Sequence, residues 1–485
     1  MVSAVLFITF FVLLVLNVPI AVCLGLSSAA AILYSGTSLT IVATNIYSGI
    51  SKFLLLAIPF FVLSGNIMAK AGISTRLIRF VDTCVGHRKG GIANVCIIVA
   101  CFFGAISGSG PATVAALGAV LIPAMVERGG FSAAFSTALM ATSSSIAIVI
   151  PPSIAFVVYA SITGVSIGDM FMAGIIPGIL MGLALVVVVM LEVRRNHVVP
   201  SNVEKASAKE RWNAFKDAFW GFLMPVIILG GIYGGIFTPT EAAAVSVVYG
   251  LFVGMIIYKE VKFKDLWEIL IDSAKTTGGI MLIVACASLF SFVCTRFGIS
   301  TAASELLARV AGNQFTFLLI CKIIFLIAGC FIDANSAMYI FIPIMLPVCK
   351  ALGYNVIAFG IMATVNLAIG QVTPPVGVNL FVAIGIKLRD GIRVTLQEIS
   401  RAVVPMVAAS IVVLLIITYI PQISTCLPAA LGSAAAIENG ETAGGDSGTT
   451  QTDNDDFNTI GDYSDLDWAD MTWNFTCSTT ETSTW

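Results

Sequence analysis

Oxygen-bearing side chains gather at four places in a sequence that is otherwise apolar over long stretches. Hydroxyl, amide, carboxylate and backbone carbonyl oxygens are the ligands that small, hard cations prefer. The pattern therefore predicts a site for a cation such as Na⁺, assembled from four separate segments. The candidate side chains are Ser107, Ser109 and Thr113; Thr142, Ser143, Ser144 and Ser145; Asp333, Asn335 and Ser336; and Thr364, Asn366, Thr373 and Asn379.

Asp333 is the one charged residue in the stretch 323–349. A carboxylate inside a membrane segment is a functional candidate by default, and a cation is its natural partner. The alternative is a structural role, in which Asp333 caps a helix by accepting hydrogen bonds from nearby N–H groups. For any single Ser or Thr, a hydrogen bond to the carbonyl four residues earlier is the commoner role. Glu241 belongs to the capping box Thr238-Pro239-Thr240-Glu241, so its predicted role is structural.

The composition excludes a soluble protein. The chain has 485 residues, of which 58% are hydrophobic and 11% charged, and its mean hydropathy is +0.99. Soluble domains carry about 25% charged residues, so the sequence predicts a polytopic membrane protein. It contains no P-loop, no HExxH motif and no Ser/His/Asp set, so we expect neither an enzyme nor a nucleic-acid-binding protein. The cysteines, without a CxxC pair, predict no metal centre.

Three stretches without any Asp, Glu, Lys or Arg are too long to cross the membrane once as a single helix. They are residues 92–126, 131–168 and 351–386. A helix of 35 residues is about 52 Å long, whereas the hydrocarbon core is ~30 Å thick. Each stretch is interrupted by residues that break helices, namely Gly108-Ser109-Gly110-Pro111, Pro151-Pro152 or Pro374-Pro375. Broken backbone at membrane depth needs protein, water or an ion to satisfy it. We therefore expect re-entrant hairpins over 92–126 and 316–349, and broken helices over 131–163 and 351–386.

The two halves of the chain match at a nearly constant separation. Gly72-Ile73-Ser74-Thr75 recurs as Gly298-Ile299-Ser300-Thr301, and Pro151-Pro152 recurs as Pro374-Pro375. The matches predict a first repeat over 1–195, a linker over 196–217, a second repeat over 218–425 and an acidic, disordered tail over 426–485. Residues 1–34 are expected to make two short passes that divide at Asn17-Val18-Pro19, with the N-terminus outside.

Basic residues indicate how the repeats are oriented. By the positive-inside rule, the basic segments face the cytoplasm. Their equivalents in the other half carry few charges, so the halves are predicted to be inverted. Inverted repeats with discontinuous helices are typical of secondary transporters, where helix ends bind an anionic solute and a cation. The basic segments are 76–89, 194–216, 259–264 and 387–401.

Two motifs resemble those of a known family. The runs Gly104–Thr113 (GAISGSGPAT) and Thr373–Asn379 (TPPVGVN) are similar to those of the large membrane subunit of the tripartite ATP-independent periplasmic (TRAP) transporters. The similarity covers residues 1–425. It implies an all-α polytopic membrane protein, an inverted-repeat elevator-type secondary transporter with two re-entrant hairpins and two broken helices. The implied location is the cytoplasmic (inner) membrane of a bacterium or archaeon.

The resemblance also implies an activity, partners and site residues. The activity is Na⁺-coupled import of organic acids such as C4-dicarboxylates or sialic acid. The partners are a separate small four-helix membrane subunit and a periplasmic substrate-binding protein. No cofactor is expected, and Na⁺ is the coupling ion. The implied Na⁺ ligands are Ser107, Ser109 and Thr113 with the backbone of Val149 and Pro151, and Asp333 with Gly370 and Thr373. The residues expected to contact the organic acid are Ser144, Ser145, Asn335, Ser336, Asn366, Pro374 and Asn379.

Two alternatives stay open at this point. A self-sufficient Na⁺/anion symporter of related fold would take up substrate without a binding protein. A channel or membrane scaffold without coupling would show Na⁺-independent flux or none, and would tolerate the substitution Asp333→Ala.

Overall fold

The computed structural model describes residues 1–16, 18–195, 205–386, 388 and 394–432. The chain divides into two units, Met1–Gly440 and Glu441–Trp485, and the account below concerns the first. The secondary structure of the described residues is entirely helical, and this part contains nine helices that are long and apolar enough to cross a membrane. The protein is therefore an all-α, multi-pass membrane protein. The predicted tail beyond 432 lies outside the described residues.

Two helical hairpins occupy the places predicted at 92–126 and 316–349. The first consists of α6 (Gly91–Ser107) and α7 (Gly110–Glu127), and the second of α15 (Gln314–Phe331) and α16 (Ala334–Ala351). Only two residues connect the helices of each pair. Gly108, with φ of 60°, ends α6 in the left-handed conformation that favours glycine.

Two broken helices follow the hairpins, as predicted. The first comprises α8 (Ala133–Ser145), a 3₁₀ turn over Ile146–Ile148 and α9 (Ile154–Thr163). The second comprises α17 (Val356–Gly370) and the short α18 (Val378–Ile384). Each break contains its double proline, with a cis bond between the two prolines. Proline lacks an N–H group, so the helix cannot continue through these positions.

Two short amphipathic helices lie at matching places in the two halves of the chain. The basic segment 76–89 lies largely in α5 (Ile73–Val85), and the matching place in the second half forms α14 (Ile299–Ala311). In α5, the apolar side chains at positions 73, 77, 78 and 81 are buried on one face, which is the helical spacing. The repeated Gly-Ile-Ser-Thr motif forms the start of both helices, and its glycine has φ of 68° in each copy.

The remaining helices complete the described part of the fold. The second repeat was expected to begin at 218, and the helix at this place, α11, runs from Ala208 to Tyr233. It starts earlier because Ser207 and Glu210 form a capping box ahead of it. The capping box at Thr238–Glu241 is present as predicted and starts α12. The others are α4 (Ala57–Lys70), α10 (Ile167–Arg195), α12 (Pro239–Leu251, continued as a π-helix over Phe252–Ile257), α13 (Asp265–Arg296), α19 (Leu396–Tyr419) and the short α20 (Gln422–Ala430), which passes the repeat boundary expected at 425.

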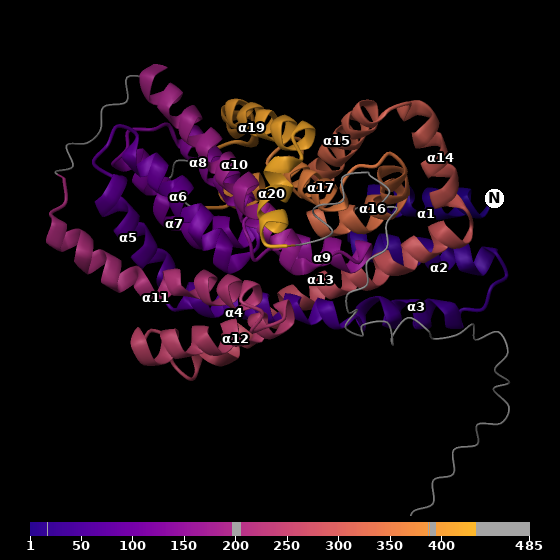
Figure 1. Ribbon diagram of the computed structural model, residues 1–485, viewed down its shortest axis with the longest axis horizontal. Helices are drawn as coiled ribbons and strands as arrows, with labels where there is room; N and C mark the ends of the chain where they lie inside the picture. The colour runs from indigo at the N-terminus through magenta and orange to yellow at the C-terminus, as the bar shows by residue number, and fades with distance from the viewer. Residues whose placement is uncertain (17, 196–204, 387, 389–393, 433–485) are drawn as a thin grey trace, which may run out of the picture. The chain divides into compact units, whose positions relative to one another are not determined.

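The helices of this unit pack as two groups. The frame helices are α1 (Val2–Val15), α2 (Ile20–Tyr34), α3 (Thr40–Ile50), α4, α11, α12 and α13, and they contact one another. The predicted division of residues 1–34 corresponds to α1 and α2, which lie side by side. The inner helices are the two hairpins, the two broken helices, α10 and α19. Figure 1 shows α3, α4, α11, α12 and α13 along one side of the inner helices, and α5 and α14 connect the groups.

Candidate cation and solute site

The tip of the first hairpin lies directly on the first break. A Cβ atom built on Gly108 would be 2.9 Å from the carbonyl oxygen of Pro152, and one on Gly104 would be 2.7 Å from the Cα of Ala147. Neither position has room for a side chain. The two glycines therefore let the backbone of α6 and of the turn approach the break closely.

The second hairpin meets the second break in the same manner. A Cβ atom on Gly370 would be 2.6 Å from the Cα of Gly329, so the two helices touch through backbone atoms. The N–H of Gly377 donates to the carbonyl oxygen of Cys330 at 3.2 Å. Gly370, which the resemblance assigns to a Na⁺ site, thus lies against the end of α15.

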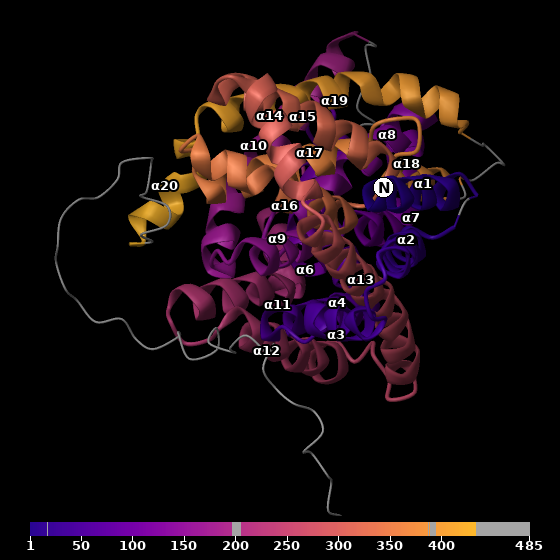
Figure 2. The same ribbon diagram turned by 90° about the vertical axis from the view of Figure 1, so that its right-hand side faces the viewer.

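Each broken helix also contacts the opposite hairpin. The short helix α18 packs on α7 and α8, and α9 packs on α16 (Figure 2). The first turn of α7 reaches the second break, because a Cβ atom on Gly110 would be 2.8 Å from Nδ2 of Asn379 and 3.2 Å from Oε1 of Gln371. The two hairpins and the two breaks therefore meet in one region.

Buried polar atoms without partners mark this region. Asn379 is fully buried, and among the described residues neither its Oδ1 nor its Nδ2 has a hydrogen-bond partner. The same holds for Oε1 of Gln371, which is 5% exposed. A buried polar group left unpaired costs roughly 1–3 kcal/mol, so such groups call for an ion, a water or a ligand. Asn379 is a residue that the sequence predicts to contact the solute.

Gln371 was missed in the sequence. It is a neutral amide at the end of a helix and belongs to neither quoted motif. The available signal was its position, directly after Gly370 and two residues before Thr373, at the start of the predicted break. Polar residues at such breaks face an internal cavity more often than lipid.

Three oxygen atoms form a compact group at the first tip. Oγ of Ser107 and Oγ1 of Thr113 are 2.8 Å apart, and Oγ1 of Thr113 donates to the carbonyl oxygen of Ser109 at 2.8 Å. Thr113 is fully buried. Ser109 contributes its carbonyl to this group. Of the backbone positions implied as further ligands, the Val149 carbonyl lies against Gly174 of α10, and Pro151 lies in the break that the tip covers.

Asp333 caps the first turn of α16. Its Oδ2 accepts from the N–H groups of Asn335 at 3.0 Å and Ser336 at 3.2 Å, and its Oδ1 accepts from Oγ of Ser336 at 2.5 Å. This is the structural role weighed in the sequence. The hydroxyl of Thr373, in the second break, donates back to the last turn of α17, to the carbonyl of Ile369 at 2.7 Å. Among the described residues, no direct hydrogen bond joins Asp333 to Thr373.

Other candidates have local partners. The hydroxyls of Ser144 and Ser145 donate to carbonyls three residues earlier in α8. Asn366 donates from Nδ2 to the carbonyl of Lys322 in α15 at 2.8 Å, and its Oδ1 has no partner in the described part of the chain. Oδ1 of Asn335, beside the Asp333 cap, is buried and unpaired in the same part. Pro374 is partly exposed in the second break.

Comparison with known proteins gives a consistent picture. A family signature described as "Tripartite ATP-independent periplasmic transporter, DctM component" matches residues 7–423. The C4-dicarboxylate TRAP transporter large permease protein DctM of Rhodobacter capsulatus is 38% identical over 87% of this chain and 97% of its own. The protein of the same name from Pseudomonas aeruginosa is 41% identical, over 84% of this chain and 94% of its own.

One further relative and one solved structure extend the comparison. The isethionate TRAP transporter permease protein DctMQ of Oleidesulfovibrio alaskensis is 40% identical over 86% of this chain, which covers 65% of that protein. In fold, the chain resembles the crystal structure of the Alcanivorax borkumensis YdaH transporter, with a TM-score of 0.54 and 14% identity over 81% of this chain and 88% of that one. On the evidence of the near full-length matches, this chain belongs to the DctM family, the large permease component of the tripartite ATP-independent periplasmic transporters.

Proposed function

We propose that this chain is the large transmembrane subunit of a Na⁺-coupled importer of small organic acids. The observation that carries the proposal is the buried amide of Asn379 together with Oε1 of Gln371, which lie beside Gly110 and have no hydrogen-bond partners among the described residues. The amide N–H groups of Asn379 suit a carboxylate of the solute. The helix α7 begins at Gly110, so the positive end of its dipole lies in the same region and favours an anion there.

The coupling ion is proposed to bind at the first hairpin tip. Ser107, Thr113 and the carbonyl of Ser109 offer three neutral oxygens within a few ångströms, a donor set that suits Na⁺. Asp333 is the candidate for a second ion. Its cap leaves lone pairs on both carboxylate oxygens, since each oxygen can accept more than one bond.

Relatives indicate the substrate class. The similar proteins are named for C4-dicarboxylates, isethionate and 2,3-diketo-L-gulonate. All three are small anionic organic acids, so we propose a substrate of this class for the present chain. Sugar acids such as sialic acid belong to the same chemical group.

The proposed mechanism is an elevator motion with two partners. The inner helices would shift against the frame helices while carrying ion and solute between them. A small four-helix membrane subunit would enlarge the frame, and a periplasmic binding protein would deliver the acid. The family's tripartite description and the relative named DctMQ support these partners. The proposed location is the cytoplasmic (inner) membrane of a bacterium.

The test is uptake by proteoliposomes that contain this chain and its candidate partners. Radiolabelled succinate, isethionate and sialic acid are each supplied with an inward Na⁺ gradient, with K⁺ in its place, or without the binding protein. We expect uptake of one acid that requires both Na⁺ and the binding protein. Uptake without the binding protein would support the self-sufficient symporter, and Na⁺-independent flux would support the channel.

Two variants assign the residues. Asn379→Leu should raise the substrate concentration for half-maximal uptake by at least about tenfold, because a site built around hydrogen bonds loses a partner. Thr113→Val should instead raise the Na⁺ concentration required. The matched controls are Asn45→Leu on α3 and Thr137→Val on α8, whose side chains bond to carbonyls of their own helices. Equal effects in a variant and its control would remove that residue from the site.

A further inference from the structure

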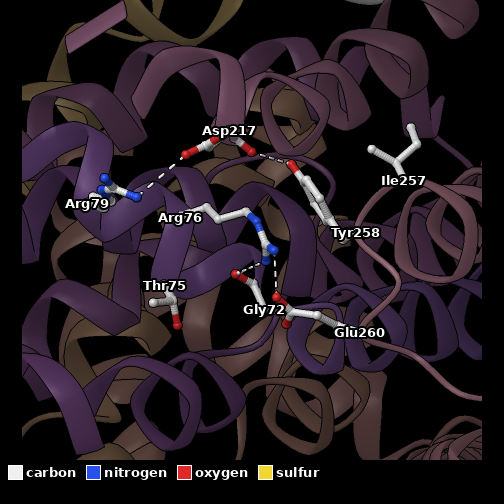
Figure 3. A pocket seen from close by; sticks show the side chains of 8 residues that line it. All are labelled: Gly72, Thr75, Arg76, Arg79, Asp217, Ile257, Tyr258 and Glu260. Atoms are coloured by element: carbon white, nitrogen blue, oxygen red, sulfur yellow. Dashed lines mark hydrogen bonds and ion pairs between the residues drawn. The ribbon is translucent and has the colours of Figure 1, made fainter. Parts of the chain in front are cut away.

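A cavity of about 440 Å³ lies where α5, α11 and the segment after the π-helical end of α12 meet. Its charged and polar lining consists of Thr75, Arg76, Arg79, Asp217, Tyr258 and Glu260 (Figure 3). None of these residues belongs to the hairpins or the broken helices. The cavity is therefore separate from the proposed transport site.

One wall of the cavity is fixed by Arg76. Its Nη2 donates to Oε1 of Glu260 at 2.5 Å, its Nη1 donates to the carbonyls of Ala71 and Gly72 at 3.1 Å, and its guanidinium lies 3.9 Å above the ring of Tyr258. A Cβ atom on Gly72 would collide with the Glu260 carboxylate, and φ of Gly72 is 68°. Only glycine leaves space here for the Glu260 carboxylate, so Gly72 allows the ion pair between Arg76 and Glu260 to form.

The Tyr258 hydroxyl also holds the wall that Arg76 and Glu260 form. It donates to the backbone carbonyl of Asp217 at 2.6 Å. Burial raises the pKa of Tyr258 to about 12, so the hydroxyl remains a donor at neutral pH. This bond holds the turn of α11 that carries the Asp217 carboxylate.

The opposite wall has groups that can rearrange. Arg79 and Asp217 are 3.6 Å apart, and their side chains are 69% and 52% exposed. An exposed ion pair of this kind contributes little and opens readily. Thr75 is exposed and lines the cavity, so its hydroxyl is accessible. One guanidinium, one carboxylate and one hydroxyl can thus turn to contact a ligand.

The balance of charge in the cavity indicates a ligand that carries both a positive and a negative group. Two guanidinium groups and two carboxylates line the cavity, so a lone anion or a lone cation would meet as much repulsion as attraction. A zwitterion can satisfy both. Arg79 has the planar fork that suits a phosphate, while the carboxylates suit an ammonium group.

The surroundings point to a lipid. The apolar side chains of Phe219, Phe252 and Ile256 are 40%, 45% and 60% exposed, and they lie on the same elements as the lining residues Asp217 and Ile257. The acyl chains of a lipid whose headgroup occupies the cavity would cover such exposed apolar side chains. The amphipathic helix α5 fits a position at the membrane surface.

We propose that this cavity binds the headgroup of a phospholipid with a primary amine, of the phosphoethanolamine class. The phosphate would face Arg79 and Thr75, and the ammonium group would face Asp217 and Glu260. The proposal is independent of Na⁺ coupling and of the transported acid.

The test is native mass spectrometry of the detergent-purified full chain. It is titrated with phosphatidylethanolamine, phosphatidylcholine or phosphatidylglycerol that have identical acyl chains. We expect one phosphatidylethanolamine to bind about tenfold more tightly than phosphatidylcholine, whose methylated amine cannot donate hydrogen bonds. Arg79→Gln should weaken phosphatidylethanolamine binding by about tenfold. The matched control is Lys275→Gln, because Lys275 forms an exposed ion pair of 3.4 Å outside the cavity.

Several outcomes would overturn the proposal. Equal binding of phosphatidylethanolamine and phosphatidylcholine excludes recognition of the amine, and tighter binding of phosphatidylglycerol indicates an anion site. If free phosphoethanolamine or inorganic phosphate competes as well as the intact lipid, the ligand is soluble. Asp217→Asn is the second variant in case Arg79→Gln fails to fold, and unchanged lipid selectivity in a folded Asp217→Asn protein also contradicts the proposal.

Discussion

Replacing Lys52 with methionine is expected to loosen the contact between the frame helices and the inner helices. Lys52 lies in the turn before α4, and its Nζ donates to the carbonyl oxygen of Ser161 at 2.7 Å. Ser161 belongs to the last turn of α9, where carbonyls lack intrahelical donors and carry the negative end of the helix dipole. An ammonium group is a suitable cap at this position. If the inner helices shift during transport, the contact must break.

The size of the effect follows from the environment of Lys52. A hydrogen bond to a charged group contributes about 1.5–3 kcal/mol. Burial lowers the pKa of Lys52, so the cost of desolvating the ammonium group offsets part of this gain. A net contribution of about 1 kcal/mol corresponds to roughly a fivefold change in the ratio of two conformations.

Spin-label distance measurements can detect this change. Labels on cysteines that replace Ser48 on α3 and Ser166 after α9 report the separation of the two groups. In Lys52→Met, the population with the separation seen here should fall about fivefold relative to the others, whereas Lys52→Arg should retain it. Identical distance distributions for Lys52→Met and the unsubstituted protein would refute the reasoning, as would equal losses in both variants.

Three further experiments test separate parts of the structure. Asn caps helices as well as Asp does, so Asp333→Asn should leave the melting temperature unchanged while raising the Na⁺ concentration needed for uptake; an unchanged Na⁺ requirement would leave the residue as a cap alone. Gly370→Ala forces a Cβ atom onto backbone of the second hairpin and should cost about 1–3 kcal/mol of stability, seen as a lower melting temperature in detergent. Gly278→Ala, with open space around it, should be neutral or slightly stabilising. A cysteine that replaces Lys205 should react with an impermeant thiol reagent only from the cytoplasmic side, and one that replaces Arg309 only from the outside. Labelling of both cysteines from the same side would contradict inverted repeats.

The hairpins and broken helices could be predicted because they depend on length and helix-breaking residues. An uncharged stretch such as 92–126 is too long to cross once, and Gly108 to Pro111 cannot continue a helix. Short amphipathic helices were less visible. In α5, two arginines and an aspartate interrupt the apolar residues, and four buried apolar positions over 13 residues carry a weak signal. The start of α11 depends on a local capping box at Ser207, which an apolar count does not detect.

The candidate site was predictable by segment rather than by side chain. The positions of Asn379 and Asp333 follow from the breaks, because residues at helix ends are forced into the region where the ends meet. Which atoms are left unpaired depends on tertiary contacts. The hydroxyl of Ser144 turns to its own helix, whereas Gln371 lies beside the first turn of α7 because Gly110 leaves it space. Sequence spacing alone contains neither fact. The Na⁺ ligands and the inverted orientation stay predictions.

The shortness of the two hairpin turns limits how a bound solute can be released. Only Gly108 and Ser109 separate α6 from α7, and only two residues separate α15 from α16. Such turns contain no spare chain that could swing aside as a flap. Opening the site at the hairpin tips would require the helix ends to unwind. This would leave backbone N–H and C=O groups without hydrogen-bond partners inside the membrane. Under the proposed elevator mechanism, access would be governed by displacement of rigid bodies, and the region between the two tips would face the two sides of the bilayer in turn.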